Sequence, residues 1–282
     1  MMTINPALFL VGHGSRDAEG NEEFLAMAER LKRRRPERAV YSAFVELAEP
    51  SITDELDRCV RDGHEDVVVL PLLFFAAGHA KTDVPREMLR ARERHPRVRF
   101  HYGPPLGIHP VLLDVVDERV QAVEHGLPPR DRRETAILLV GRGSSDPDAN
   151  GDLLKIARLY WERTRYGWVE ICFIGVTEPD LPAGLDRCLR LGARRVIAIP
   201  YFIFTGVLIK RIHRIVAEAA AAAVGVEIAA GDYLGRHPAF LDVVEQRARE
   251  TLEGPILMSC DTCKYRDPDL VFHGAKTPGH GQ

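Results

Sequence analysis

The sequence lacks four features that would place it in a specialised class of protein. Five cysteines in 282 residues are too few for a disulfide scaffold, so a reducing cytoplasm is the expected compartment. No apolar run approaches the roughly 18 residues of a membrane span, and no secretory signal is evident at the N-terminus. Lys and Arg number 38 against 41 Asp and Glu, and a net charge of −3 does not favour a nucleic-acid partner. With 45% hydrophobic residues, the chain is expected to be globular and soluble.

One motif occurs twice. Leu10–Ser15 reads Leu-Val-Gly-His-Gly-Ser, and Leu139–Ser144, 129 positions later, reads Leu-Val-Gly-Arg-Gly-Ser. The same offset aligns Phe44–Phe75 with Phe173–Phe204 without a gap. An offset maintained over so much of the chain predicts an internal repeat, in which both halves share one fold.

Each half alternates short apolar runs with helical patterns. In the first half the expected strands are Ala7–Val11, Ala39–Val45, Val67–Leu72 and Val98–Tyr102, and the expected helices are Asn21–Arg34, Pro50–Arg61, Val84–Arg94 and Pro110–Glu124. This alternation predicts an α/β fold in which each half is a parallel sheet with helices on both faces. We expect a first domain at 1–126, a linker at 127–133, a second domain at 134–253 and a loosely structured tail at 254–282.

The two copies differ at three positions that bear on chemistry. In the second half His13 is replaced by Arg142, Glu46 by Gly175 and His79 by Leu208. Residues common to both copies, such as Cys59 and Cys188, are expected to serve the fold. By contrast, the three first-half residues all follow strands at the carboxyl edge of one sheet, where open α/β sheets bind ligands. Two imidazoles and a carboxylate suit Co²⁺, Fe²⁺ or Ni²⁺ and leave coordination positions for a substrate.

Three segments carry a resemblance to a known family. Gly12–Arg16, Glu46–Ser51 and Gly78–Pro85 resemble the signatures of the sirohydrochlorin chelatases, class II chelatases that insert Co²⁺ or Fe²⁺ into an early tetrapyrrole. From Ala7 to about Leu252 the chain is similar to their long, two-domain cobaltochelatase form, a lyase of early-cobalt cobalamin biosynthesis. The resemblance implies two flavodoxin-like domains facing each other across a cleft, the second a degenerate copy.

The resemblance also implies roles for particular residues. The residues at positions 13, 46 and 79 would bind the incoming metal or handle protons. The acidic side chains of the tetrapyrrole would need polar and cationic partners, for which the candidates by position are Ser15, Arg16, Lys81, Arg142, Lys210 and Arg211. No Gly-x-x-x-x-Gly-Lys phosphate loop is present, and this chemistry requires no nucleotide.

The tail contains a Cys-x-x-Cys element at Cys260 and Cys263. Such a pair can be a redox dithiol, half of a zinc site or part of an iron–sulfur site, and in long members of the family a similar element is assigned to an iron–sulfur cluster. Two thiolates are half of the usual four ligands. A cluster would therefore need a second chain, an outside ligand, or a histidine such as His273 or His280. A homodimer is one assembly that the sequence leaves open.

Three other functions compete with cobalt insertion. A sirohydrochlorin ferrochelatase for siroheme would use the same ligands, and a non-catalytic tetrapyrrole or metal carrier would use the same cleft. A phosphate-binding α/β enzyme could use the Gly-His-Gly loop as an anion nest. The phosphate hypothesis leaves Glu46 unexplained, because a nearby carboxylate repels phosphate.

Overall fold

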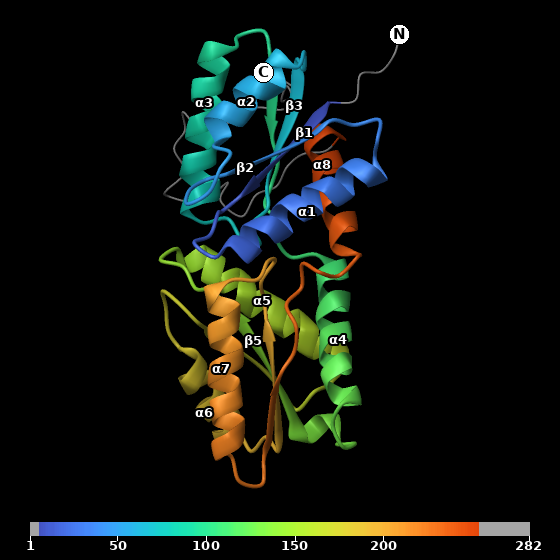
Figure 1. The fold of residues 1–282 in the computed structure, drawn as a ribbon. Coiled ribbons are helices and arrows are strands. Elements are labelled where there is room, and N and C mark those ends of the chain that lie inside the picture. The colour runs from blue at the N-terminus through green and yellow to red at the C-terminus, as the bar shows by residue number, and fades with distance from the viewer. Residues whose placement is uncertain (1–5, 254–282) are drawn as a thin grey trace, which may run out of the picture. The chain divides into compact units, whose positions relative to one another are not determined.

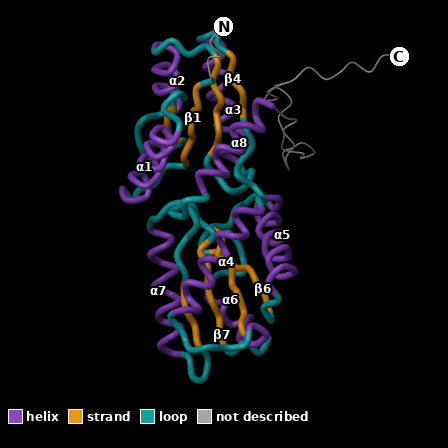
Figure 2. Tube along the Cα trace, turned by 90° about the vertical axis from the view of Figure 1, so that its right-hand side faces the viewer, coloured by secondary structure: helices purple, strands orange, loops and turns teal. Residues whose placement is uncertain are grey.

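A computed structural model describes residues 6–253 and contains two parallel four-stranded sheets (Figures 1 and 2). The first sheet has the order β2-β1-β3-β4, with β1 at Ala7–Gly12, β2 at Val40–Phe44, β3 at Asp66–Pro71 and β4 at Arg99–Tyr102. The second has the order β6-β5-β7-β8, with β5 at Thr135–Gly141, β6 at Trp168–Phe173, β7 at Arg195–Pro200 and β8 at Glu227–Ala230. The predicted α/β class and the parallel strand pairing are confirmed.

Helices connect the strands in both sheets. Those of the first half are α1 (Ala18–Arg34), α2 (Ile52–Arg61), α3 (Val84–Arg94) and α4 (Pro110–His125); those of the second are α5 (Pro147–Thr164), α6 (Leu181–Arg190), α7 (Val207–Ala222) and α8 (Phe240–Glu253). Short π and 3₁₀ turns lie at His79–Asp83 and Arg132–Glu134. Within residues 6–253, none of the helices combines the length and apolar character needed to cross a membrane.

The central strands β1, β3, β5 and β7 are mostly apolar because helices cover both faces of each sheet. All six residues of β1 are buried. Alternate residues of β1, such as Phe9 and Val11, pack against α2 and α3. On the opposite face Phe24 of α1 lies against Gly12. The resulting layers place the sheet in the middle of the core and leave the strand ends open to carry a site.

The last helix of each half does not pack where its position in the chain suggests. The structure divides into two compact units: the first comprises 6–16, 21–107 and 244–253, and the second 17–20 and 108–243. Helix α4 therefore belongs to the second unit, and most of α8 belongs to the first. Arg247 of α8 donates two hydrogen bonds to the Leu106 carbonyl of the first unit, at 2.9 and 2.7 Å. The expected domains at 1–126 and 134–253 follow the repeat, and the compact units follow a different division.

One local expectation needs correction. Helix α2 begins at Ile52 rather than Pro50, because the Ser51 hydroxyl caps it by accepting a hydrogen bond from Asp54 N at 3.1 Å. Within the expected linker at 127–133, the Pro128 carbonyl accepts a hydrogen bond from Arg195, and Arg130 pairs with Glu227 at 3.2 Å.

Candidate metal centre

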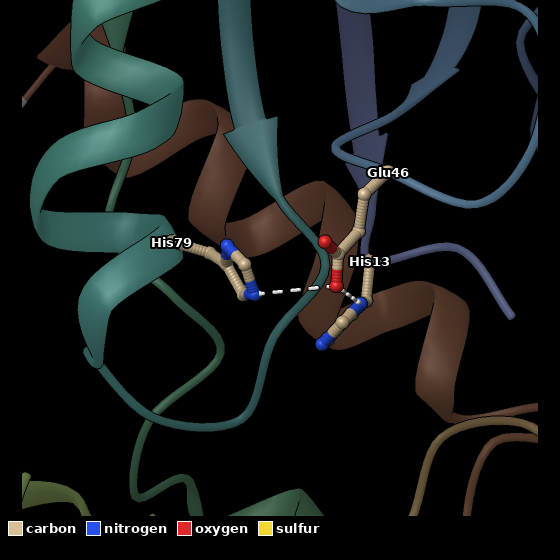
Figure 3. A group of neighbouring side chains, drawn as sticks. All are labelled: His13, Glu46 and His79. Carbon is tan, nitrogen blue, oxygen red and sulfur yellow. Dashed lines mark ion pairs between the residues drawn. The ribbon is translucent and has the colours of Figure 1, made fainter. Parts of the chain in front are cut away.

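Three loops of the first unit bring His13, Glu46 and His79 together (Figure 3). His13 directly follows β1, and β1 lies between β2 and β3 in the sheet. The loops after the two flanking strands carry Glu46 and His79, so both reach the end of β1. The order β2-β1-β3-β4 is that of flavodoxin-like folds, whose ligands bind at the switch point between β1 and β3.

The three side chains offer donor atoms around one point. His13 Nδ1 lies 3.6 Å from Glu46 Oε1, and His79 Nε2 lies 3.9 Å from the same oxygen. The imidazole centroids are 4.5 Å apart and the rings are nearly perpendicular, at 71°. One donor atom from each residue lies within 4.8 Å of the others. This is the one group of three or more such residues that the described part of the chain contains.

The backbone holds Glu46 against the first loop. Glu46 N donates a hydrogen bond to the His13 carbonyl at 3.1 Å, and Val45 N donates to Gly12 O at 2.9 Å. Gly14 has a φ of +90°, and a Cβ there would lie 1.7 Å from the Glu46 carbonyl oxygen. A side chain at position 14 would therefore push the carboxylate loop away, which explains why the motif requires glycine there.

Asn21 shapes the His13 loop and was missed in the sequence. Its side chain accepts a hydrogen bond from Ser15 N at 2.9 Å and donates one to Ser15 O at 2.8 Å. Asn150 makes the same two bonds with Ser144. Asn150 lies 129 positions after Asn21, so the repeat offset was the signal that could have found it. Because both bonds are made to the backbone of Ser15, the Asn21 side chain fixes the conformation of this loop.

Asp83 was also missed. His79 begins the π turn, and Asp83 ends it. The Asp83 Oδ2 atom lies 2.7 Å from His79 Nδ1, on the opposite edge of the ring from Nε2. The signal was the four-residue spacing of a histidine and an acid, which brings their side chains together on a helical turn.

The candidate tetrapyrrole-binding cations have varied surroundings. Arg16 and Arg142 are exposed, whereas Lys81 is 7% exposed. Lys210 forms ion pairs with Asp17 at 2.8 Å and Glu19 at 3.0 Å, both in the second unit. Hydrogen bonds to these carboxylates raise the pKa of Lys210, and the bond from Lys210 lowers the pKa of Asp17. The substrate-binding roles of Ser15, Arg16, Arg142 and Lys210 stay predictions.

The cysteines divide between the folded units and the tail. Cys59 and Cys188 are fully buried, and burial raises the pKa of each thiol to about 12. These residues pack in the core, as the repeat predicts. Cys260 and Cys263 lie outside the described residues.

The group of His13, Glu46 and His79 can bind one divalent cation and still admit another ligand. Two neutral imidazoles and one carboxylate supply three donors, and a transition metal has further positions for a substrate. The exposed fractions of the three side chains, 22%, 48% and 29%, leave the site accessible to a metal. A parallel α/β sheet with a three-donor site at its carboxyl edge defines a class of metal-handling protein with a flavodoxin-like fold.

Comparison with known proteins agrees with this class. The CbiX family model matches residues 7–123 and again 136–251. The chain is 42% identical to a sirohydrochlorin cobaltochelatase of Priestia megaterium, over 92% of this chain and 84% of that protein. It is 34% identical to a sirohydrochlorin ferrochelatase of Bacillus subtilis, over 88% and 92% of the two chains.

A solved structure gives the same fold. The sirohydrochlorin chelatase SirB of Bacillus subtilis subspecies spizizenii, in complex with cobalt, matches with a TM-score of 0.74 at 31% identity. The match covers 89% of this chain and 97% of SirB. The chain belongs to the CbiX family.

Proposed function

We propose that the protein is a sirohydrochlorin cobaltochelatase, which inserts Co²⁺ into sirohydrochlorin for cobalamin biosynthesis. The observation that carries the proposal is the convergence of His13, Glu46 and His79 on one point at the carboxyl edge of the first sheet. The names and sequences of the relatives support a tetrapyrrole substrate. Cobalt is proposed over iron because identity is higher with the cobaltochelatase, 42% against 34%.

The reaction exchanges one cation for two protons. A divalent metal enters the macrocycle, and the two pyrrole N–H groups each lose a proton. Neutral imidazole is both a common metal ligand and a base near neutral pH. As His13 and His79 release the metal to the ring nitrogens, each regains a lone pair that can accept one pyrrole proton. Glu46 offsets the positive charge throughout this exchange, because its carboxylate lies beside both imidazoles.

The second half is proposed to be a degenerate repeat of the first. Its sheet has the same strand order, and the family model matches it separately. At the metal positions it has Arg142, Gly175 and Leu208 instead. A guanidinium has no lone pair to offer a cation, so this half is proposed to serve tetrapyrrole binding.

An absorbance assay tests the proposed activity directly. Purified protein is mixed with an excess of sirohydrochlorin and with Co²⁺, Fe²⁺ or Ni²⁺ in turn, and the absorbance change that accompanies insertion is followed. Many turnovers per protein molecule, fastest with Co²⁺, are expected. Fastest turnover with Fe²⁺ would favour the ferrochelatase. Binding of the tetrapyrrole with no turnover above the uncatalysed rate would indicate a carrier and contradict the proposal.

The tail carries a separate hypothesis. Cys260 and Cys263 are proposed to hold an oxygen-sensitive iron–sulfur cluster that insertion does not require, since they lie outside both matched regions. Anaerobically purified protein should be brown, and Cys260→Ser should be colourless and active. A colourless anaerobic preparation would reject the cluster, and an inactive but folded Cys260→Ser would reject its independence from insertion.

A further inference from the structure

We propose that Asp83 is a positioning residue of the metal centre: it fixes His79 with its proton on Nδ1 and turns the Nε2 lone pair toward Glu46. The inference rests on the proposed function in one respect, namely that His79 binds the metal. The first observation is the placement of the two contacts on His79. Asp83 Oδ2 lies 2.7 Å from Nδ1, whereas Glu46 Oε1 lies 3.9 Å from Nε2 (Figure 3 shows the latter).

The chemistry of the groups decides which nitrogen carries the proton. An ionised carboxylate is an acceptor only, so a bond of 2.7 Å requires Nδ1 to donate. A neutral imidazole with its proton on Nδ1 has its lone pair on Nε2. The opposite tautomer would place two acceptors in contact at Asp83 and direct an N–H at the metal position. A carboxylate that accepts from the outer nitrogen of a metal-binding histidine fixes both its tautomer and its orientation.

The local fold keeps Asp83 in register with His79. The π turn that contains them is anchored in the core by Ala80 and Val84, both 0% exposed. The Tyr102 hydroxyl donates a hydrogen bond to the Ala80 carbonyl at 2.6 Å. Because the turn cannot slide without moving these residues, the carboxylate stays beside the ring. Single π turns are often found at functional sites.

The second half provides an internal comparison. At the offset of 129, His79 corresponds to Leu208 and Asp83 to Ile212, whereas Lys81 corresponds to Lys210. Ile212 is buried in the core of the second unit. The histidine and the acid are therefore both replaced by apolar residues while a residue between them is retained. An acid needed only to start a helix would have no reason to be lost together with the histidine.

Other histidine–carboxylate pairs in the first unit differ in their charge balance. Asp57 contacts His95 at 2.7 Å and also pairs with Arg94, and Asp66 contacts His101 at 2.7 Å and also pairs with Arg99. In those pairs an arginine shares the carboxylate. The Asp83 carboxylate contacts the neutral Thr82 hydroxyl at 3.3 Å in addition to His79, so its charge acts mainly on the imidazole.

The test uses the full-length protein without tetrapyrrole, so that it does not depend on insertion. Two-bond ¹H–¹⁵N correlation spectra of histidine-labelled apoprotein at pH 8 report the tautomer of each ring. His79→Gln assigns the His79 signals. We expect the Nδ1–H tautomer in the wild type and a mixture of tautomers in Asp83→Ala. The His95 and His101 signals should stay unchanged.

The affinity for Co²⁺ alone gives the second measurement. Asp83→Ala should weaken Co²⁺ binding by about 10- to 100-fold, the usual effect of removing such a partner. Asp83→Asn retains an acceptor oxygen and should restore part of the affinity. Glu87→Ala is the matched control, because Glu87 lies one turn further on and accepts from Thr53 and Arg90 instead. It should bind Co²⁺ as the wild type does.

Two results would overturn the proposal. One is an Nε2–H tautomer of His79 in the wild-type apoprotein, which decides the matter even if Asp83→Ala fails to fold. The other is a folded Asp83→Ala whose Co²⁺ affinity and His79 tautomer both match the wild type. Asp83-dependent Co²⁺ binding without insertion would contradict the proposed activity and leave this inference standing.

Discussion

At the scale of single residues, Leu47 has an unusual backbone conformation next to Glu46. Its φ is +63°, a left-handed conformation that costs a non-glycine residue about 1–2 kcal/mol. Within residues 6–253, the one other non-glycine residue with positive φ is Arg165. Val176, the residue equivalent to Leu47 in the second half, does not have a positive φ. At this position, the left-handed conformation therefore occurs in the half that contains His13, Glu46 and His79.

Substitutions of Leu47 separate its backbone role from its side-chain role. Leu47 is 54% exposed, so Leu47→Gly removes little packing and relieves the strain. The free energy of unfolding of Leu47→Gly should stay within about 1 kcal/mol of the wild type. The greater freedom of glycine in the unfolded chain offsets the gain from removing the backbone strain. Leu47→Val, which is β-branched, should lose about 1 kcal/mol or more and weaken Co²⁺ binding.

The control for Leu47→Gly is Val176→Gly, which relieves no backbone strain. It should lower the free energy of unfolding of the protein by about 0.5–1 kcal/mol. Denaturant unfolding and Co²⁺ titration measure both quantities. If Leu47→Val binds Co²⁺ as tightly as the wild type, the left-handed conformation has no part in placing Glu46.

The thiols of the folded units should be unreactive in the native protein. Burial raises the pKa of Cys59 and Cys188 to about 12 and also raises the pKa of Cys172. A raised pKa means less thiolate at a given pH, and the thiolate is the reactive form. In a Cys260→Ser/Cys263→Ser variant at pH 8, a thiol reagent should therefore label nothing rapidly until denaturant is added. Rapid labelling of any of the three would contradict their burial.

At the scale of secondary structure elements, the strands could be predicted from sequence and the packing partners of two helices could not. Buried parallel strands appear as continuous apolar runs, and β1 and β3 were expected within one or two residues of their observed ends. The periodicity of α4 and α8 shows that each helix has an apolar face. It does not show which sheet that face packs against. In the structure, α4 belongs to the second unit and most of α8 belongs to the first.

His13, Glu46 and His79 could be predicted from the repeat, whereas Asp83 was missed. Replacement in the second copy singled out His13, Glu46 and His79, and the structure brings them together. Asp83 is replaced in the same way, but an acid at the start of a helix has an ordinary structural explanation through the helix dipole. The four-residue spacing from His79 was the available signal, but the π turn that brings the two side chains together cannot be identified from the sequence.

Helix α8 is predicted to stabilise the first unit. Val244 and Ala248 are fully buried, and burying a valine side chain contributes about 1.5–3 kcal/mol. A chain that ends at Ala239 should therefore lose several kcal/mol of stability and the cooperative unfolding of the first unit. The matched control ends at Glu253 and retains α8. Circular dichroism during thermal unfolding compares the two, and equal midpoints would mean that α8 contributes nothing.

At the scale of the whole molecule, metal binding is proposed for one of two halves that share a sheet topology. The two sheets share their topology, and each has a Gly-x-Gly-Ser loop whose backbone is held by an asparagine. What differs is the set of side chains on those loops. The proposed difference in function between the halves therefore rests on a few residues on a common scaffold, consistent with a fold that does not itself determine activity.

The most direct measurement is the rate of Co²⁺ insertion into sirohydrochlorin by three folded variants. His13→Ala and the His13→Ala/His79→Ala double variant remove metal ligands at loop positions and should lose at least about 100-fold in rate, a loss of roughly 2.7 kcal/mol in transition-state stabilisation. Their free energies of unfolding should change by less than about 1 kcal/mol. Arg142→Ala, the equivalent change in the second half, should bind Co²⁺ normally and continue to turn over. Insertion at the wild-type rate by the double variant, or loss of Co²⁺ binding in Arg142→Ala, would contradict the central claim.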